Sequence, residues 1–259
     1  MKNEIVITCS IVLFKERITD LDKTINSFLN VPFKKKLFLI DNTPDKFFEY
    51  VFVHENIEYI SVDENIGFGS AHNIVIDKIR DLSAYHLILN PDVYFKFNVI
   101  QNLILELQKD NSLAMIAPKV LFPDKKHQYS CRRYPSFAEL FARRFISLKP
   151  FFKAVIYKGT YRDKNLNNPF FAEYITGCFH LYNTNDFISL KGFDERYFLY
   201  MEDVDICRKI DVLGKKKLYY PNEEIIHLLK QGSSKKIRLF FIHFSSIIKY
   251  FMKWGFKLS

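Results

Sequence analysis

A carboxylate at the end of an apolar segment is the first feature of this chain that could do chemistry. Asp92 closes the tripeptide Asn90-Pro91-Asp92, which directly follows the strand-like residues 87–89. An exposed carboxylate at that position suits Mg²⁺ or Mn²⁺, which take oxygen ligands and usually keep contacts to substrate phosphates. The same tripeptide is also a common turn. Asp92 is therefore predicted to hold a divalent cation only if other segments complete a site.

A second acidic cluster follows the aromatic-rich residues 192–201. Glu202, Asp203 and Asp205 lie within four residues of one another. Transfer of a sugar to a hydroxyl needs a group that takes the hydroxyl proton as the new bond forms, and a carboxylate can act as that general base. The same acids would equally suit the first turn of a helix, where they complement the helix dipole.

A glycine-containing segment, residues 64–73, separates a strand-like stretch from a helix-like one. Gly67 and Gly69 permit a tight turn and let a ligand approach the backbone. The helix N-terminus that follows favours an anion. The spacing matches neither the GxGxxG pattern nor a Walker loop, so an ordinary loop is the alternative.

Alternating strand-like and helix-like segments must position these groups. We expect strands at residues 5–14, 37–40, 57–62, 85–89 and 113–117, and helices at 21–29, 71–79 and 99–107. Repeated βα units of this kind predict an α/β fold with a mostly parallel sheet flanked by helices. Ligands of such sheets gather at the carboxyl ends of the strands, where Asp41 and Asp92 both fall.

The second half of the chain is less regular. Residues 120–171 are rich in Arg, Lys, Phe, Tyr and Pro, and we interpret them as a cover near the site rather than a separate domain. A strand at 174–183 and a helix at 202–213 follow. The expected organisation is one domain over residues 1–234, with a nucleotide-binding half at about 1–119 and an acceptor-side half at about 120–234.

A C-terminal amphipathic helix is expected at residues 235–254, within a separate segment 235–259. Such a helix either packs on its own domain or lies on a membrane surface. Its polar face holds Arg238, Ser245, Ser246, Lys249 and Lys253, its apolar face holds Phe240, Phe244, Ile247, Ile248 and Phe251, and Leu239, Ile242 and Tyr250 intrude on the polar side.

Composition excludes several classes of protein. With 48% hydrophobic residues, 8 Gly and 9 Pro, the chain of 259 residues is neither disordered nor fibrous. Its four cysteines form no CxxC pair, which argues against a zinc or redox site and suits a reducing cytoplasm. Residues 5–14 fit a buried first strand better than a signal peptide, and no run reaches the roughly 18 uncharged apolar residues of a membrane span.

The net charge of +9 would suit nucleic acid, an anionic membrane or a phosphorylated substrate. The basic residues form short clusters, such as 34–36 and 215–217, that we interpret mainly as solvated surface. Two other functions are open at this point: a basic module that binds anions without catalysis, and a glycoside hydrolase with paired carboxylates. Asp92 and Asp203 would repel phosphate without a metal, so no specific binding of nucleic acid is expected.

Taken together, these segments resemble a known family. NIGFGSAHN is similar to the NxGFxxAxN motif, LNPDV to a version of the DxD motif, TGCFHLYN to the GAxxLxRR strand, and GFDERYFLYMEDVDICRKI to the GFDExFFxYxEDxDLxxR stretch. His227 with residues 232–234 is similar to a late His-x-x-Gly-x-Ser element, one residue longer here. These motifs belong to the rhamnosyltransferase-like branch of family 2 glycosyltransferases, and the resemblance runs in order from about residue 4 to 254.

The resemblance implies a GT-A fold and an inverting displacement. Asp92 would hold Mg²⁺ or Mn²⁺, and Asp203 would be the general base, with Glu202 as the catalytic carboxylate beside it. The chain departs from the family pattern at Lys15, which replaces an Asn, and at residues 182–183, which lack the arginines of the GAxxLxRR strand. The residues implied at the nucleotide-sugar donor are Val12, Asp41 at the nucleoside, Asn65, Gly67, Asn73, Asn90 in place of the first Asp of DxD, and His227, which would face the diphosphate or the acceptor.

The resemblance also implies the partners. The donor would be a nucleotide sugar, with dTDP-rhamnose as the leading candidate and a UDP- or GDP-sugar as the alternative. The acceptor would be a hydroxyl of a bacterial surface polysaccharide, such as O-antigen or capsule, or of a lipid-linked glycan precursor. We therefore expect a cytoplasmic enzyme that can also lie peripherally on the cytoplasmic face of the inner membrane.

Overall fold

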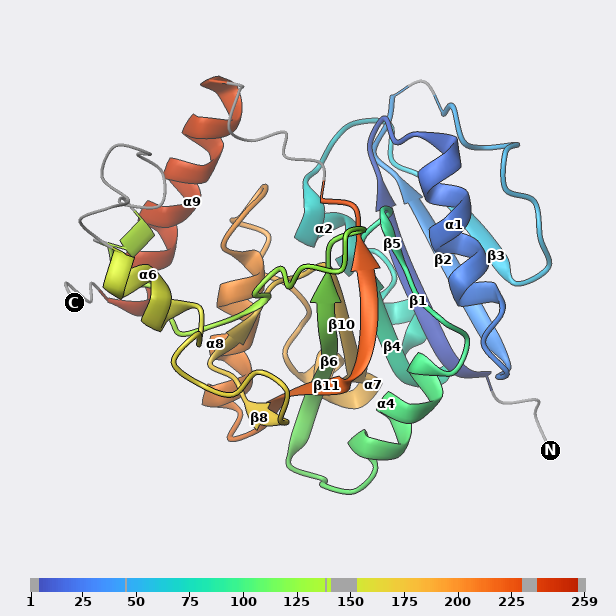
Figure 1. The fold of residues 1–259 in the computed structure, drawn as a ribbon. Helices are drawn as coiled ribbons and strands as arrows, with labels where there is room; N and C mark the ends of the chain where they lie inside the picture. The colour runs from blue at the N-terminus through green and yellow to red at the C-terminus, as the bar shows by residue number, and fades with distance from the viewer. Residues whose placement is uncertain (1–4, 45, 138, 141–152, 230–236, 256–259) are drawn as a thin grey trace.

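The computed structural model describes residues 5–44, 46–137, 139–140, 153–229 and 237–255. Their main feature is one mixed sheet of nine strands with helices on both faces (Figure 1). The strand order is β3-β2-β1-β4-β10-β6-β11-β5, and β8 pairs with β11 outside this path. The α/β architecture predicted from the alternating segments is therefore confirmed.

The first half of the chain builds a parallel block of the sheet. This block contains β1 (Ile5–Leu13), β2 (Lys35–Asp41), β3 (Ile57–Ser61) and β4 (Ser83–Leu89). Antiparallel β10 (Phe179–Asn183) connects β4 to β6 (Leu113–Leu121), which runs parallel to β11 (Lys216–His227). Short strands β5 (Val93–Tyr94) and β8 (Phe170–Phe171) pair antiparallel with β11. The two expected halves thus share one continuous sheet.

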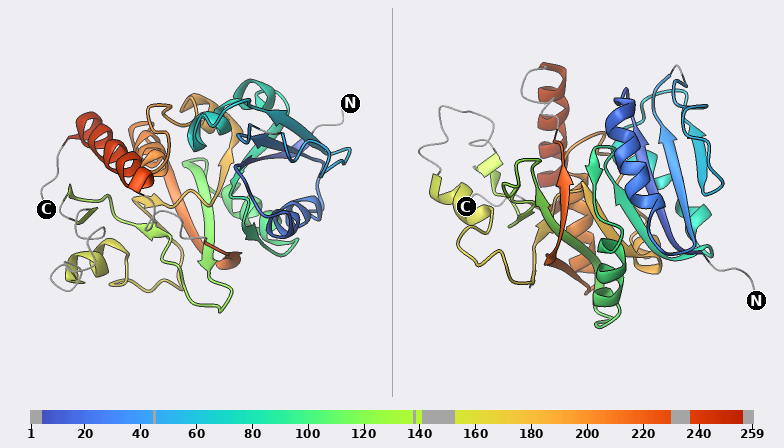
Figure 2. Two further views of the ribbon diagram at one scale, coloured as in Figure 1. Left: turned by 90° about the horizontal axis from the view of Figure 1, so that it is seen from above. Right: turned by 45° about the vertical axis from the view of Figure 1, so that its right-hand side comes forward.

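Alternating side chains of the strands supply a core on each face of the sheet. Helices lie over both faces (Figure 2). In β2, Leu37 and Leu39 face the core that includes α1 (Ile18–Leu29) and α4 (Val99–Leu107), whereas Phe38 and Ile40 face the other. Successive side chains of a strand point to opposite faces, so strands covered on both sides are apolar throughout. The second core includes residues from five helices. These are α2 (Phe68–Asn73), α3 (Ile76–Ile79), α7 (Thr184–Ser189), α8 (Glu202–Val212) and α9 (Ile237–Trp254).

Some expected elements differ from the observed ones. The helix expected at 71–79 is two short helices, α2 and α3, and the strand expected at 174–183 is interrupted at residues 176–178 between β9 (Tyr174–Ile175) and β10. β11 has no counterpart among the expected strands because it begins in the lysine cluster 215–217. That cluster is not all solvated surface: Lys217 is buried, donates to the Cys207 carbonyl at 3.0 Å and forms an ion pair with Asp211.

The irregular residues 120–171 contribute short elements around the end of the sheet. They contain β7 (Cys131–Arg132), which pairs with β9, and α6 (Lys153–Gly159). Residues 141–152, which belong to the expected cover, lie outside the described part of the chain.

The C-terminal helix α9 packs on its own domain. Tyr250 and Phe251 are buried, and the Trp254 indole N–H donates to Asp205 Oδ1 at 2.7 Å. Lys253 lies 2.8 Å from the same oxygen. Ser246 is also buried, so two residues of the expected polar face point inward. Among the described residues, no helix is both long and apolar enough to cross a membrane.

Three histidines lie in the interior without solvent contact. His86 is placed between Thr8 Oγ1 at 2.8 Å and Ser10 Oγ at 3.1 Å. His72 Nδ1 lies 2.7 Å from Ser10 Oγ, and His180 Nε2 faces a backbone carbonyl at 2.9 Å. Burial lowers the pKa of all three, to about 3 for His86 and about 4 for His180. They are therefore neutral in the folded protein.

We expect acid to destabilise the protein through these histidines. The unfolded chain binds a proton at each histidine near pH 6.5, whereas folded His180 resists protonation down to about pH 4. Within that window each such group lowers the free energy of unfolding by about 1.4 kcal/mol per pH unit. The variant His180→Gln should be less stable than the parent near neutral pH but lose stability less steeply between about pH 6 and pH 5. Urea unfolding measures this, and parallel pH curves for both proteins would contradict it.

Candidate active site

A pocket of about 380 Å³ opens where several parallel strands end. The topology explains its position, because ligand sites of such sheets lie outside the carboxyl ends of the strands. Six residues predicted from the sequence line it: Val12, Asn65, Gly67, Asn90, Asp92 and His227. The other lining residues are Phe14, Glu16, Asn42, Phe68, Pro91, Phe198, Leu199, Tyr200 and Leu229.

One wall of the pocket is a tight turn at Gly67. Its φ is +94°, and a Cβ at this position would lie 2.3 Å from the carbonyl oxygen of Phe198. The N–H of Phe68 donates to that same oxygen at 3.0 Å, and the Asn65 side chain accepts from the Gly67 N–H at 3.0 Å. Glycine is therefore required both for the left-handed backbone and for the close approach of another backbone segment.

Asn73 and Asp41 do not line the pocket. Asn73 accepts from the N–H of Phe193 and donates to its carbonyl, both at 2.9 Å. It therefore holds the segment that leads to residues 198–200, which form one wall of the pocket and are called the 198–200 wall. Asp41 is fully buried, and its carboxylate accepts from the Tyr59 hydroxyl at 2.7 Å and from the Thr43 N–H at 2.8 Å. Their predicted contacts with the donor stay predictions.

Another part of the wall carries a buried pair of a carboxylate and an imidazole. Asp92 Oδ1 lies 3.2 Å from His227 Nε2, and both side chains are almost closed to solvent. The other ring nitrogen, His227 Nδ1, lies 2.9 Å from Gln128 Oε1, which orients the ring. Burial opposes protonation of His227, but Cys178 and Asp92 favour it more strongly, and the pKa of His227 is raised to about 10. Gln128 belongs to no motif, so sequence patterns gave no signal for it.

Asp92 and His227 fit a divalent cation. Within the described ranges, no cluster of three or more His, Cys, Asp or Glu could hold a metal. Mg²⁺ does not need such a cage, because one or two carboxylates together with substrate phosphates and water complete its shell. Asp92 supplies the carboxylate, His227 adjoins it, and Asn90 lines the same pocket. This donor set fits a cation whose remaining ligands come from a diphosphate.

The second acidic cluster begins helix α8. Tyr200 and Met201 have left-handed backbones, with φ of 68° and 70°, and Glu202 and Asp203 follow in the first turn of the helix. Asp203 Oδ2 accepts from the N–H of Gly177 at 3.2 Å. Glu202 is buried, and its Oε2 has no hydrogen-bond partner within the described residues.

The two carboxyls differ in how well their charged forms are stabilised. Burial raises the pKa of both, and the Asp203 charge raises the pKa of Glu202 further. The N–H groups of Val204 and Gly177 partly offset this rise at Asp203, whereas only its own backbone N–H does so at Glu202. Glu202 therefore holds a proton more readily, and Asp203 is the member of the pair that stays ionised.

Asp203 lies beside the pocket rather than in its lining. A Cβ at Gly177 would lie 3.3 Å from Asp203 Cβ and 3.8 Å from the ring of Phe68, which is a pocket residue. The N–H of Asn90 donates to the carbonyl of Cys178 at 2.9 Å. The turn at 176–178 therefore connects the strand end at Asn90 and Asp92 to the acidic pair.

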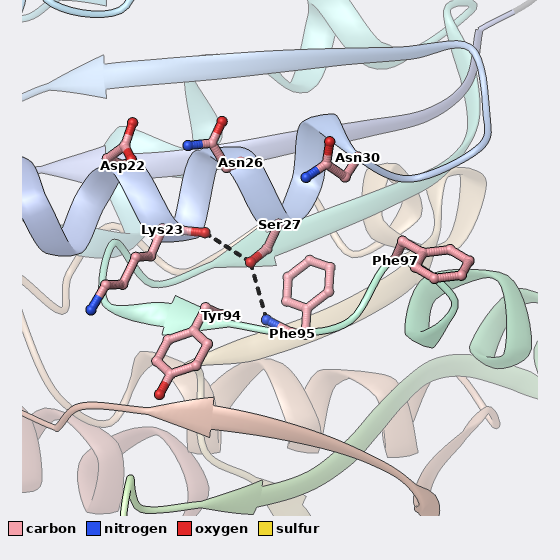
Figure 3. Close-up of a pocket in the computed structure, with 8 residues that line it drawn as sticks. All are labelled: Asp22, Lys23, Asn26, Ser27, Asn30, Tyr94, Phe95 and Phe97. Carbon is pink, nitrogen blue, oxygen red and sulfur yellow. Dashed lines mark hydrogen bonds between the residues drawn. The ribbon is translucent and has the colours of Figure 1, made fainter.

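A second hollow, of about 520 Å³, lies between α1 and the segment around β5 (Figure 3). Ser27 Oγ donates to the Lys23 carbonyl at 2.8 Å and accepts from the Phe95 N–H at 3.1 Å, which ties the helix to this segment. None of the predicted site residues lines it, so its larger volume does not make it the active site. Its lining residues are Asp22, Lys23, Asn26, Ser27, Asn30, Tyr94, Phe95 and Phe97.

Comparison with known families decides the class. The family model for glycosyl transferase family 2 matches residues 9–187, which is more than half of the chain. The chain belongs to glycosyl transferase family 2. The glycine turn, the Asp92 strand end and the start of β10 all fall within the matched residues, and α8 follows them.

Curated relatives of this family 2 glycosyltransferase are rhamnosyltransferases. Rhamnosyltransferase WbbL of Escherichia coli K12 is 24% identical over 201 residues, which cover 74% of this chain and 72% of that protein. The N-acetylglucosaminyl-diphospho-decaprenol L-rhamnosyltransferase of Mycobacterium tuberculosis is 26% identical over 186 residues, which cover 67% of this chain and 59% of that protein. The predicted rhamnosyltransferase-like branch of family 2 is confirmed.

Solved structures show the same fold. The crystal structure of GalNAc-T7 with UDP, GalNAc and Mn²⁺ matches with a TM-score of 0.64 at 16% identity, over 87% of this chain and 43% of that chain. The crystal structure of S. aureus TarS matches with a TM-score of 0.60 at 10% identity, over 87% of this chain and 37% of that chain. The family 2 chain thus spans less than half the length of either, and the likeness confirms the predicted GT-A fold.

We expect Gly67→Ala to disturb the pocket specifically. The new Cβ would meet the Phe198 carbonyl at a position with φ of +94°, so the loss of stability should be about 1–3 kcal/mol and nucleotide affinity should fall with it. Gly214→Ala is the matched control, because Gly214 has φ of +72° with nothing within 4 Å, and it should leave nucleotide affinity unchanged. Urea unfolding and nucleotide titration measure both effects. Equal losses of affinity in the two variants would rule out a specific role for the contact.

Proposed function

We propose that this family 2 chain is an inverting transferase that moves a sugar from a nucleotide-diphosphate donor to a hydroxyl of a glycan. The leading donor is dTDP-rhamnose. The observation that carries the proposal is the grouping around one pocket of the Gly67 turn, the Asp92–His227 pair and, just beyond Phe68, Asp203. The names of the curated relatives support rhamnose as the transferred sugar.

The donor side of the pocket must manage the charge of the leaving group. Cleavage of the anomeric bond leaves negative charge on the donor's diphosphate, and a bound divalent cation supplies Lewis-acid neutralisation of that charge. Asp92 would hold this cation together with His227, whose Nε2 must first release its proton, and Gln128 keeps the imidazole oriented. Groups fixed in advance in this way cost no reorganisation during the reaction. Val12 and Asn65 shape the part of the pocket that we give to the nucleoside and sugar.

The acidic pair would activate the acceptor. Asp203 takes the proton of the acceptor hydroxyl as its oxygen attacks the anomeric carbon, on the face opposite the departing diphosphate, which inverts the configuration. The N–H of Gly177 orients its carboxylate. Glu202, beside it and buried, keeps a proton, so the pair carries one charge rather than two.

The acceptor is proposed from the relatives. The mycobacterial relative is named as a rhamnosyltransferase of N-acetylglucosaminyl-diphospho-decaprenol. By analogy, the acceptor here is a lipid-linked glycan precursor or a growing surface polysaccharide, such as O-antigen or capsule. An enzyme with such an acceptor works at the cytoplasmic face of the inner membrane as a peripheral protein.

Two alternatives make different predictions. Another family 2 donor, a UDP- or GDP-sugar, would use the same cation site and differ only in the nucleoside and sugar. A non-catalytic, anion-binding module would use the net charge of +9 instead. Such a module should bind DNA with a steep dependence on salt, whereas a transferase should bind it weakly and without specificity.

The variant Asp203→Asn tests the base. It should bind the donor like the parent and lose turnover by about 10²–10⁴-fold, because the proton acceptor is gone. Glu202→Gln replaces the neighbouring group, which we expect to be protonated, and should keep most of the activity. Product formation and donor titration in both variants separate catalysis from binding. Full activity of Asp203→Asn would remove that residue from the base role.

A donor screen tests the function as a whole. Thermal shifts with dTDP-rhamnose and with UDP-, GDP- and CMP-sugars, each with and without Mn²⁺ or Mg²⁺, should single out one nucleotide. A donor at about 100 times its Kd stabilises the fold by about 2.7 kcal/mol. This gain should require the metal and vanish in Asp92→Ala but not in Asp22→Ala, a carboxylate of the other hollow. No stabilisation by any nucleotide would contradict the proposed transferase and favour the anion-binding module.

A further inference from the structure

Helix α9 is bound directly to the segment that forms one wall of the donor pocket. Ser246 Oγ donates to the Leu199 carbonyl at 2.9 Å, and Lys249 Nζ donates to the Arg196 carbonyl at 2.7 Å. The rings of Tyr200 and His243 lie 4.7 Å apart. These contacts fix α9 relative to the pocket, so what binds along α9 is held at a defined position beside the site.

A groove of about 500 Å³ runs along this helix. We call it the α9 groove, and its lining residues are Phe198, Arg238, Phe241, Ile242, Ser245, Ser246 and Lys249. Phe198 also lines the donor pocket, so the two hollows meet at this residue. The lining combines two cations with apolar side chains and contains no carboxylate. Such a surface complements a ligand with a negative head and an apolar tail.

An exposed apolar stripe extends the groove along the outer side of α9. Ile237, Phe241, Phe244, Ile248 and Met252 recur three or four residues apart and are all exposed. Side chains at this spacing lie on one face of a helix. The buried face of α9, with Tyr250 and Phe251, already packs on the domain, so the stripe is not needed for folding. Contiguous exposed apolar surface on a helix is typical of a binding site for a lipid or a protein.

We propose that the α9 groove binds the prenyl diphosphate end of the acceptor. This inference rests on the proposed function and deepens it, because it assigns the acceptor's lipid end to residues of α9. Arg238 offers a planar guanidinium that pairs with phosphate oxygens. Among the described residues Lys249 uses one of its three N–H donors, in the bond to Arg196. The prenyl chain lies against Phe241 and Ile242 and continues over the stripe. The sugar then passes Phe198 into the donor pocket, where Asp203 lies beyond Phe68.

The position of the groove favours the acceptor over the donor. We place the donor's diphosphate at Asp92 and His227, which line the donor pocket. There the Asp92 carboxylate requires a cation between itself and the phosphate. The α9 groove needs no cation, because its own charges are positive. Binding of a lipid diphosphate at α9 should therefore persist in EDTA, unlike binding of the donor.

Calorimetry with farnesyl diphosphate, in EDTA and in the Asp92→Ala background, tests the site without a donor or turnover. Binding should weaken at least about tenfold in Phe241→Ser and in Arg238→Ala/Lys249→Ala. Matched controls lie at the hollow of Figure 3: Phe97 is 62% exposed, against 61% for Phe241, so Phe97→Ser is the apolar control. Lys23→Ala/Lys96→Ala removes the same charge, Lys23 from this hollow and Lys96 from a neighbouring hollow that shares Tyr94 and Phe95 with it. Both controls should bind like the parent. Equal binding by all variants would overturn the proposal.

Two further binding measurements separate a prenyl diphosphate site from a site for phosphate alone and from contact with the bulk membrane. If inorganic diphosphate binds as tightly as farnesyl diphosphate and Phe241→Ser has no effect, the groove is a phosphate site only and the proposal fails. If Arg238→Ala/Lys249→Ala loses binding to phosphatidylglycerol vesicles but keeps farnesyl diphosphate, α9 contacts the bulk membrane and the proposal also fails. Since these measurements involve no nucleotide, a failed donor screen with intact binding at α9 would sink the proposed function while leaving the site in place.

Discussion

The whole site depends on one close contact between two backbones. The turn at Gly67 lies so near the carbonyl of Phe198 that a side chain has no room, and the N–H of Phe68 donates to that oxygen. This contact connects a loop of the parallel half of the sheet to the segment that leads into α8. It forms one side of the donor pocket, and it sets the distance between that pocket and Asp203. Asn73 reinforces it through the backbone of Phe193.

The acidic groups of the site work in different surroundings. Asp92 faces an imidazole whose pKa is raised, so its charge is balanced by His227 in the folded protein, and a cation that binds there would displace the His227 proton. Asp203 is held by backbone N–H groups beside Glu202, and burial raises the pKa of both carboxyls. We propose Asp92 for neutralisation of the leaving group through a cation and Asp203 for deprotonation of the acceptor, the two functions of the proposed transfer. In the fold, the turn at 176–178 lies between the strand end that carries Asp92 and the Asp203 carboxylate.

The sequence predicts those parts of this arrangement that depend on local pattern. The alternation of strand-like and helix-like segments predicts the strands of the parallel block. The ends of those strands predict the positions of Asp92 and of the Gly67 loop. The hydrogen bonds that Asn73 and Asp41 make in the structure were not predictable, because their partners are distant in the sequence: Phe193 is 120 residues from Asn73, and Tyr59 is 18 residues from Asp41. β11 is missed because Lys217 is buried through an ion pair that no periodicity reveals. The burial of Ser246 and Lys253 in α9 likewise depends on tertiary partners.

The most direct test of this account is a crystal structure of the protein with dTDP and Mn²⁺, in which anomalous scattering locates the metal. The account predicts one Mn²⁺ in direct contact with the Asp92 carboxylate, the diphosphate on the far side of the metal, and the nucleoside between Val12 and the Gly67 turn. A metal bound elsewhere, or a nucleotide outside this pocket, would contradict the central claim that the Asp92–His227 strand ends form the donor site.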